Sequence, residues 1–219
     1  MIPRRLRVAL VDDHVLVLQA IADMVAAEAD LEVVATGATA DEALSLLDAH
    51  GPDVLVLDLA LGDDGGLDLV RRISRRHPGV SIVVLSMFPE EVFAERALRA
   101  GAVGYVMKDQ APEALLEAIR SAGAGQIHVS PRLRQQAVQR LTGRPGVEHG
   151  VDDLTDRELD VFRLVGEGLT SREIAARLGL SVKTVETHRT KVMRKLGLEN
   201  AHQLVHRAIL WIHRSIRMP

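Results

Sequence analysis

The sequence predicts an α/β domain with a doubly wound, five-stranded parallel sheet, followed by an all-α domain of four helices that contains a helix-turn-helix. Three observations indicate this fold class. Short apolar runs alternate with helical apolar spacing over residues 1–130, a stretch rich in Gly and Pro follows, and the remainder shows only helical patterns. The 219 residues, 47% of them hydrophobic, are enough for two ordinary cores.

Strand-like runs and helical stretches alternate in the first part of the chain. The apolar runs predict strands at 7–11, 31–36, 54–58, 81–86 and 104–107. Apolar residues at helical spacing predict helices near 14–28, 40–50, 67–76, 90–100 and 112–123. Five such strand-helix units form a doubly wound parallel sheet.

A linker separates the two predicted domains. Ser130 and Pro131 have the residue types of a helix N-cap and first helical position, so a short helix over 131–142, ended by Gly143, is expected. The Gly- and Pro-rich stretch 143–150 then breaks the pattern. We therefore expect an α/β domain over 1–130, a linker over 131–152 and a helical domain over 153–219.

Explicit capping signals mark the helices of the last part. Thr155 with Glu158, and Thr170 with Glu173, each match a capping box, which predicts helices that begin near 156 and 171. A tight turn over 178–181 leads into a third helix over about 182–196, stopped by Gly197. Asn200 is expected to cap a fourth helix that ends near His213. The second and third helices with their turn form the helix-turn-helix.

Charge is divided unevenly along the chain. Residues 1–130 have a net charge of −9, whereas 131–150 and 151–219 each have +3. The acidic part suits a cation and the basic part suits a polyanion, since five positive side chains lie between Lys183 and Lys195 with only Glu186 against them. Cysteine is absent, and no hydrophobic signal or membrane-length apolar stretch is found, so a cytoplasmic location is expected.

Polar residues follow the apolar runs at the points where chemistry is expected. Asp12 and Asp13 follow the first run, Asp58 ends the third, Ser86 ends the fourth and Lys108 follows the fifth. The carboxyl ends of parallel strands meet at one edge of a sheet. Carboxylates, a hydroxyl and a lysine at one place favour a site for a hard divalent cation and a phosphoryl group.

Both halves resemble the two-component response regulators of the NarL/FixJ subfamily, which join a receiver domain of flavodoxin-like fold to a LuxR-type DNA-binding domain. The matching stretches of the first half are Val11-Asp-Asp-His14, Asp58-Leu59 with Gly66, Leu85-Ser-Met87 and Ala100-Gly-Ala-Val-Gly-Tyr-Val-Met-Lys-Asp109. Those of the second half are Leu154-Thr-Asp-Arg-Glu158, Gly168-Leu-Thr-Ser-Arg-Glu-Ile-Ala175 and Leu180-Ser-Val-Lys-Thr-Val-Glu-Thr-His188. Their order and spacing cover nearly the whole chain.

The resemblance implies roles for the residues at the strand ends. Asp58 would be the phosphoacceptor, and Mg²⁺ would be held by Asp13, Asp58, the backbone carbonyl of Ala60 and, partly through water, Asp12. Lys108 would pair with a phosphoryl oxygen, and Ser86 and Tyr105 would form the switch pair. One departure is Gly62, which stands where the family usually has Pro.

The third helix of the last part is the expected recognition helix. Glu186, Thr187 and Thr190 are expected to reach base edges, whereas Lys183, His188, Arg189, Lys191 and Arg194 are expected to contact phosphates. Val182, Val185, Val192 and Leu196 are expected to pack inward.

The fourth helix has two apolar stripes, one of Leu204, Ala208 and Trp211 and one of Val205, Ile209 and Ile212. One stripe serves the domain's own core, and the other is available to a second copy. We place the dimer contact at Leu204, Ala208, Trp211 and Ile212, while one wide core face is the alternative.

These expectations describe a phosphorylation-dependent transcription regulator rather than an enzyme. A sensor histidine kinase or small phosphodonor would supply the phosphoryl group, and the phosphorylated homodimer would bind double-stranded promoter DNA without contacting a membrane. An aspartate-nucleophile phosphatase is disfavoured because Ala60 stands where its second Asp would be, and Asp12-Asp-His14 stands where a dinucleotide site would have glycines. A DNA-binding protein whose receiver serves only for dimerisation is the third possibility.

Overall fold

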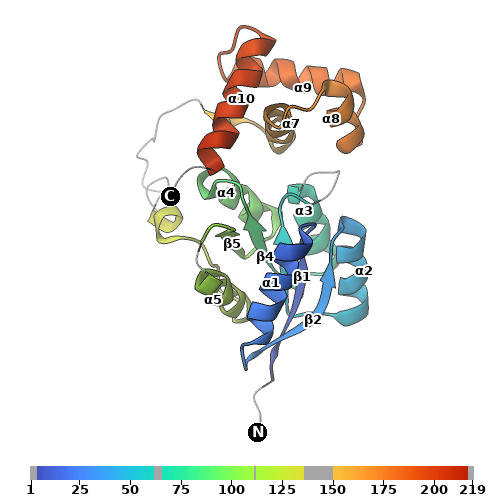
Figure 1. Cartoon of the computed structure of the whole chain (residues 1–219), viewed down its shortest axis with the longest axis vertical. Helices are drawn as coiled ribbons and strands as arrows, with labels where there is room; N and C mark the ends of the chain where they lie inside the picture. The colour runs from blue at the N-terminus through green and yellow to red at the C-terminus, as the bar shows by residue number, and fades with distance from the viewer. Residues whose placement is uncertain (1–3, 62–65, 111, 136–149, 217–219) are drawn as a thin grey trace. The chain divides into compact units, whose positions relative to one another are not determined.

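The structure, a computed structural model, describes residues 4–61, 66–110, 112–135 and 150–216. These residues divide into two compact units, one ending with the helical turn at 131–135 and the other beginning at Gly150. Figure 1 shows the strands and helices of each unit.

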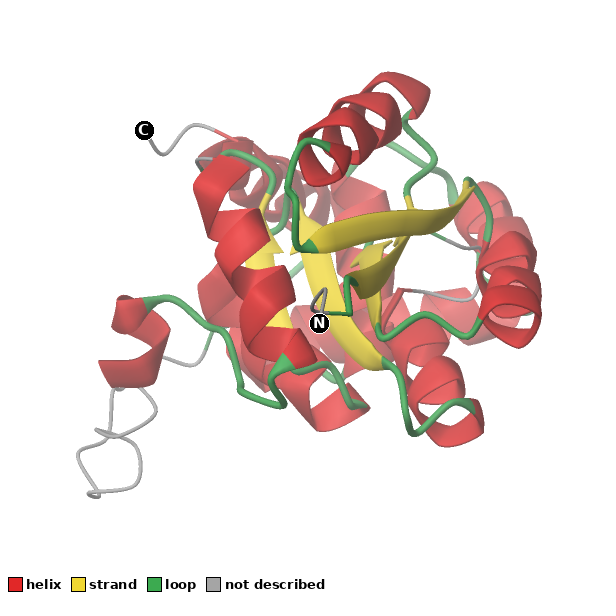
Figure 2. Cartoon of the chain, turned by 90° about the horizontal axis from the view of Figure 1, so that it is seen from below, coloured by secondary structure: helices red, strands yellow, loops and turns green. Residues whose placement is uncertain are grey.

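The first unit is a five-stranded parallel sheet in the order β2-β1-β3-β4-β5. The strands are β1 (Leu6–Val11), β2 (Leu31–Gly37), β3 (Val54–Asp58), β4 (Ser81–Ser86) and β5 (Gly104–Met107). The helices are α1 (Val15–Ala26), α2 (Ala40–His50), α3 (Gly66–Arg76), α4 (Glu90–Ala100) and α5 (Pro112–Gly123). The predicted fold class is confirmed, and Figure 2 shows helices on both faces of the sheet.

Alternation along the strands explains how both faces are covered. Val8, Leu10 and Val56 point to one face, where they pack with Leu115 and Ile119 of α5 and with the half-buried apolar face of α1. All five residues of β3 are buried, as expected for the central strand of a sheet covered on both sides.

The segment that follows α5 was not predicted to join the sheet. His128 forms an isolated parallel bridge with Gly104, at the outer edge of β5. Ser130 then caps the turn at 131–135, because its Oγ accepts a hydrogen bond from the Leu133 N–H at 3.1 Å. The predicted cap is therefore confirmed, whereas the rest of the expected 131–142 helix lies outside the described residues.

The second unit is helical, with a short 3₁₀ turn (Val151–Asp153) before α7 (Asp156–Gly166), α8 (Ser171–Arg177), α9 (Val182–Lys195) and α10 (Ala201–Ile216). Both predicted capping boxes are present, at Thr155 and Thr170. Gly166 permits the close approach of α7 to α10, because a Cβ there would lie 2.7 Å from the Ala208 carbonyl oxygen.

Candidate functional site

The strand ends bring the predicted acidic residues together. Asp12 follows β1 and Asp58 ends β3, and both are buried, each 2% exposed. One carboxylate oxygen each from Asp12, Asp13 and Asp58, with a ring nitrogen of His14, all lie within 4.8 Å of one another. This oxygen-rich set fits the hard cation that the sequence predicts.

Lys108 bridges the two buried carboxylates. Its Nζ lies 2.6 Å from Asp12 Oδ2 and 2.9 Å from Asp58 Oδ2. The second oxygen of Asp58 accepts the backbone N–H of Ala60 at 3.0 Å. Two donors, the Ala60 N–H and the Lys108 ammonium, therefore fix the Asp58 carboxylate, and the ammonium partly neutralises its charge.

Burial and hydrogen bonding act in opposite directions on the pKa values here. Burial raises the pKa of Asp58, against the Ala60 amide and the Lys108 ammonium. For Lys108, burial lowers the pKa, but its hydrogen bonds to Asp12 and Asp58 outweigh burial and leave the pKa raised. Lys108 consequently stays protonated at neutral pH, while a further cation beside Asp58 would favour its ionised form.

His14 was not predicted as part of this site. Its Nδ1 lies 2.7 Å from Asp13 Oδ1 and 3.3 Å from Asp12 Oδ1. Its backbone N–H also donates to Asp12 Oδ1 at 2.9 Å. The position of His14 could have been predicted from the sequence, because a histidine directly after two aspartates at a strand end lies close to them.

Ser86 and Tyr105 are buried together beside the cluster of Asp12, Asp13 and Asp58, which we call the acidic pocket. The Tyr105 hydroxyl donates to the Phe88 carbonyl at 2.8 Å, and the Ser86 Oγ accepts the Phe88 N–H at 3.0 Å. Burial raises the pKa of Tyr105 above its usual range, so the hydroxyl stays protonated and remains a donor. Both side chains thus contact the loop that leads into α4.

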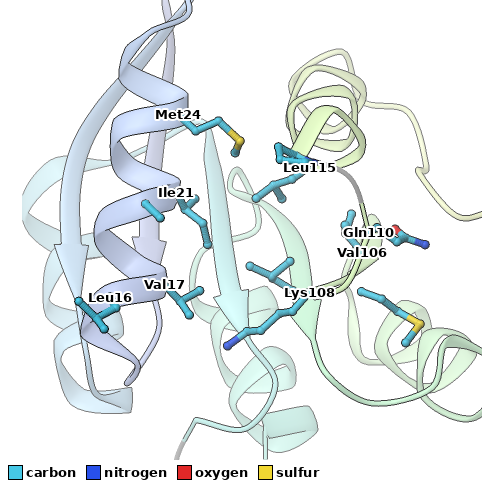
Figure 3. Close-up of a pocket in the computed structure, with 12 residues that line it drawn as sticks. Leu16, Val17, Ile21, Met24, Val106, Lys108, Gln110 and Leu115 are labelled. Carbon is cyan, nitrogen blue, oxygen red and sulfur yellow. The ribbon is translucent and has the colours of Figure 1, made fainter. Parts of the chain in front are cut away.

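An apolar pocket of about 440 Å³ lies between α1 and α5, beside Lys108 (Figure 3). Val17, Ile21 and Leu115 line it, and Leu16 at its rim is 85% exposed. This apolar lining does not suit a cation or a phosphoryl group, so we assign their binding to the carboxylates of the acidic pocket and not to this one. The sequence does not predict this pocket, because helical spacing alone does not show that no other element packs over the start of α1.

The predicted recognition helix α9 presents most of its expected DNA-facing side chains. Exposed positions are Lys183, Glu186, Thr187, Thr190, Lys191 and Arg194, whereas His188 and Arg189 are half-buried. Burial lowers the pKa of His188 below its ordinary value, with the charge of Lys191 acting in the same direction, which disfavours the charged imidazole. Val185 and Val192 pack inward as predicted, but Val182 is 45% exposed, which corrects that expectation.

A hydroxyl of α8 links two of these residues. Ser171 donates to the Glu186 carboxylate and accepts from Arg189 Nη1, the latter at 2.9 Å. The neighbouring threonines use their hydroxyl hydrogens within the helix, Thr187 to the Lys183 carbonyl at 2.9 Å and Thr190 to the Glu186 carbonyl at 3.0 Å. Ser171 was missed because its partners lie 15 and 18 residues away in the chain.

Each of the two units matches a known protein family. Residues 8–120 match the response regulator receiver domain, and residues 152–208 match the luxR family of bacterial regulatory proteins. The chain is a response regulator of the NarL/FixJ subfamily. This is a family of DNA-binding transcription regulators rather than of enzymes.

Relatives of this regulator align over almost its full length. It is 36% identical to the transcriptional regulatory protein UhpA of Salmonella typhimurium over 91% of this chain and 96% of the relative. It is 34% identical to the transcriptional activator DevR/DosR of Mycobacterium tuberculosis over 90% of this chain and 91% of the relative. Promoter-bound Salmonella RcsB, solved with the phosphomimetic BeF₃⁻, superposes with a TM-score of 0.74 at 27% identity, covering 94% and 98% of the two chains.

The regulator's last helix corrects the predicted dimer face. Leu204 and Ala208 are fully buried in the core of their own unit, so neither can contact a second copy. Trp211 stacks at a tilt on Phe162, with 5.6 Å between ring centroids, and Ile212 lies against Gly166. Leu204 and Ala208 of the predicted dimer set therefore face the core, because α10 packs along α7, whereas Trp211 and Ile212 are half-buried.

The second stripe, Val205, Ile209 and Ile212, is only half-buried. Gly62, where the family usually has Pro, lies outside the described residues. Among the residues that the structure describes, none of the regulator's helices is long and apolar enough to cross a membrane.

Proposed function

We propose that Asp58 accepts a phosphoryl group from a sensor histidine kinase or a small phosphodonor. The observation that carries the proposal is the position of Asp58, buried at the end of the central strand and held by Lys108 and the Ala60 amide. A carboxylate oxygen of Asp58 attacks phosphorus, an acyl phosphate forms, and the donor leaves with the electron pair of the broken bond. Lys108 remains to pair with a phosphoryl oxygen.

Mg²⁺ fits the donor set of this pocket. Asp12, Asp13 and Asp58, with the Ala60 carbonyl, would hold the ion, and His14 would orient the Asp13 carboxylate through its 2.7 Å contact. When bound, the ion neutralises charge on the phosphoryl oxygens and on the attacking carboxylate.

Labelling with a phosphodonor tests the assignment. Incubation with Mg²⁺ and acetyl phosphate should give an acid-stable, base-labile adduct in the wild type. Asp58→Asn should abolish the adduct, whereas Asp41→Asn, on an exposed turn of α2, should label normally. Equal labelling of Asp58→Asn and wild type would show that the phosphoacceptor lies elsewhere.

The phosphorylated regulator is proposed to act as a homodimer on promoter DNA in the cytoplasm. The exposed positive and polar side chains of α9 support this, as does a solved structure of two RcsB dimers bound to two parallel DNAs, whose chain is 29% identical to this one. In our proposal Glu186, Thr187 and Thr190 read base edges, and Lys183, Lys191 and Arg194 neutralise phosphates. The half-buried Arg189 supports the helix through Ser171, and His188, which is half-buried and has a lowered pKa, is the weaker candidate for a phosphate contact.

The dimer contact is proposed to use the half-buried stripe of α10, Val205 and Ile209, with the accessible parts of Trp211 and Ile212 beside it. These apolar side chains are only half-covered by the core of their own unit, so they are available for contact with a second copy.

We also propose the domain boundaries: a receiver at 1–130, a linker at 131–152 and a DNA-binding domain at 153–219.

A further inference from the structure

A buried carboxylate outside the acidic pocket holds the start of the linker. Glu90, the first residue of α4, is only 7% exposed. Its Oε1 accepts a hydrogen bond from the backbone N–H of Ser130 at 2.9 Å. A buried carboxylate is unfavourable unless it is hydrogen-bonded, and an ionised acceptor makes such a bond stronger than a neutral one. Glu90 therefore ties α4 firmly to the residue at which the chain leaves the receiver.

The same stretch of chain is held by the outer strand of the sheet. The His128 carbonyl accepts the Tyr105 N–H at 3.0 Å, and the His128 N–H donates to the Val103 carbonyl at 2.8 Å. Val129 and Leu133 are buried, so apolar packing adds to these bonds. We call residues 128–133 the exit segment.

The two residues that hold the exit segment, Glu90 and Tyr105, are both connected to the switch pair formed by Ser86 and Tyr105. Ser86 and Tyr105 each bond to the backbone of Phe88, which lies two residues before Glu90. Tyr105 is also the residue whose own N–H holds His128. A shift of Ser86 toward a phosphoryl group on Asp58 would break its bond to Phe88 and so move the start of α4, because the loop between them is only three residues long.

We propose that Glu90 is a positioning residue that couples the Ser86–Tyr105 pair to the linker. Its carboxylate makes the exit segment follow α4, so a change in the receiver reaches the chain that leads to the DNA-binding domain. This inference rests on the proposed function, since it concerns how phosphorylation reaches DNA binding. The neighbouring ion pair, Glu91 with Arg132 at 2.7 Å, is more exposed and contributes little.

The test compares variants in the full-length protein. Glu90→Ala removes the acceptor, Glu90→Gln keeps a carbonyl oxygen at the same place, and Glu91→Ala removes the exposed ion pair of the same turn. Two quantities are measured: amide hydrogen exchange at Ser130, and the ratio of DNA dissociation constants without and with BeF₃⁻ and Mg²⁺. The DNA is a duplex selected from random sequences by the wild-type protein.

Glu90→Ala should exchange faster at Ser130 and lower the affinity ratio by about five-fold or more. Glu90→Gln keeps an oxygen acceptor but loses its charge, so its ratio should lie between those of the wild type and Glu90→Ala. Glu91→Ala should stay within about two-fold of the wild type. Faster exchange in Glu90→Ala with an unchanged ratio would overturn the inference, since the bond would then be only structural. If BeF₃⁻ and Mg²⁺ leave the DNA affinity of the wild type unchanged, the proposed function itself is contradicted.

A second pair of variants guards against misfolding of Glu90→Ala. Ser130→Pro removes the N–H donor from the linker side, and Ser130→Ala removes only the Oγ that caps the next turn. We expect the affinity ratio to fall in Ser130→Pro and to hold in Ser130→Ala. Equal ratios in the two variants would overturn the role of Glu90.

Discussion

Replacement of Lys108 by methionine probes the charge balance of the acidic pocket. Methionine is the informative choice because the Lys108 stem lines the apolar pocket between α1 and α5, and a thioether keeps that packing while it removes the charge. At 2.6 Å and 2.9 Å from two carboxylates, each attraction is about 6 kcal/mol for an effective dielectric constant near 20. Lost hydration of all three groups offsets most of this.

The net cost is set by the carboxylates left behind. Removal of one partner from a buried ion pair typically costs about 3–5 kcal/mol. Asp12 and Asp58 lie at the sheet edge, where a cation can approach, so we expect about 3 kcal/mol without divalent ions. Because the pKa of Lys108 is raised, its contribution is fully present below its usual pKa and is lost only as pH rises through the raised value.

Calorimetry of full-length Lys108→Met at pH 7.5 in EDTA should show the receiver transition lowered by about 10 °C. Saturating Mg²⁺ should recover more stability in the variant than in the wild type, because the ion then supplies the missing positive charge. Lys183→Met, on the exposed face of α9, should leave this transition unchanged. An unaltered receiver transition in EDTA would refute the reasoning.

Four further results are expected. Thr187→Val should keep base preference and Thr187→Ser should relax it by about 1 kcal/mol at one position, because the hydroxyl hydrogen is used within the helix; competition with base-substituted duplexes measures this. Lys191→Ala should weaken binding to all sequences and reduce the salt slope by about one ion; a sequence-dependent loss would contradict a phosphate contact. Val205→Glu should weaken BeF₃⁻-induced association in sedimentation while phosphorylation continues. For Glu158, burial raises the pKa, but Lys195 and Thr155 outweigh burial and leave the pKa lowered, so Glu158→Gln should cost about 1–2 kcal/mol at pH 7 and progressively less as pH falls through the lowered pKa.

The sequence predicted the fold and the acidic pocket because both depend on local patterns. Apolar runs mark strands, and parallel strands bring their carboxyl ends to one edge, so Asp12, Asp58 and Lys108 had to meet. Capping boxes depend on residues three apart, which is why both were found.

What the sequence did not predict depends on contacts between distant segments. Leu204 and Val205 belong to two equally apolar stripes, and only the packing of α10 on α7 decides which one is buried. The bridge from His128 to β5 and the Ser171 contacts to α9 were missed for the same reason: no periodicity records a partner that far away.

The central claim is that a phosphoryl group on Asp58 strengthens DNA binding. Titration of a selected duplex with full-length protein, with and without BeF₃⁻ and Mg²⁺, tests it most directly when wild type and Asp58→Asn are compared. The wild type should bind at least about ten-fold more tightly with the phosphomimic, a coupling of about 1.4 kcal/mol. Asp58→Asn should bind equally in both conditions. Equal enhancement in both proteins, or none in the wild type, would contradict the account.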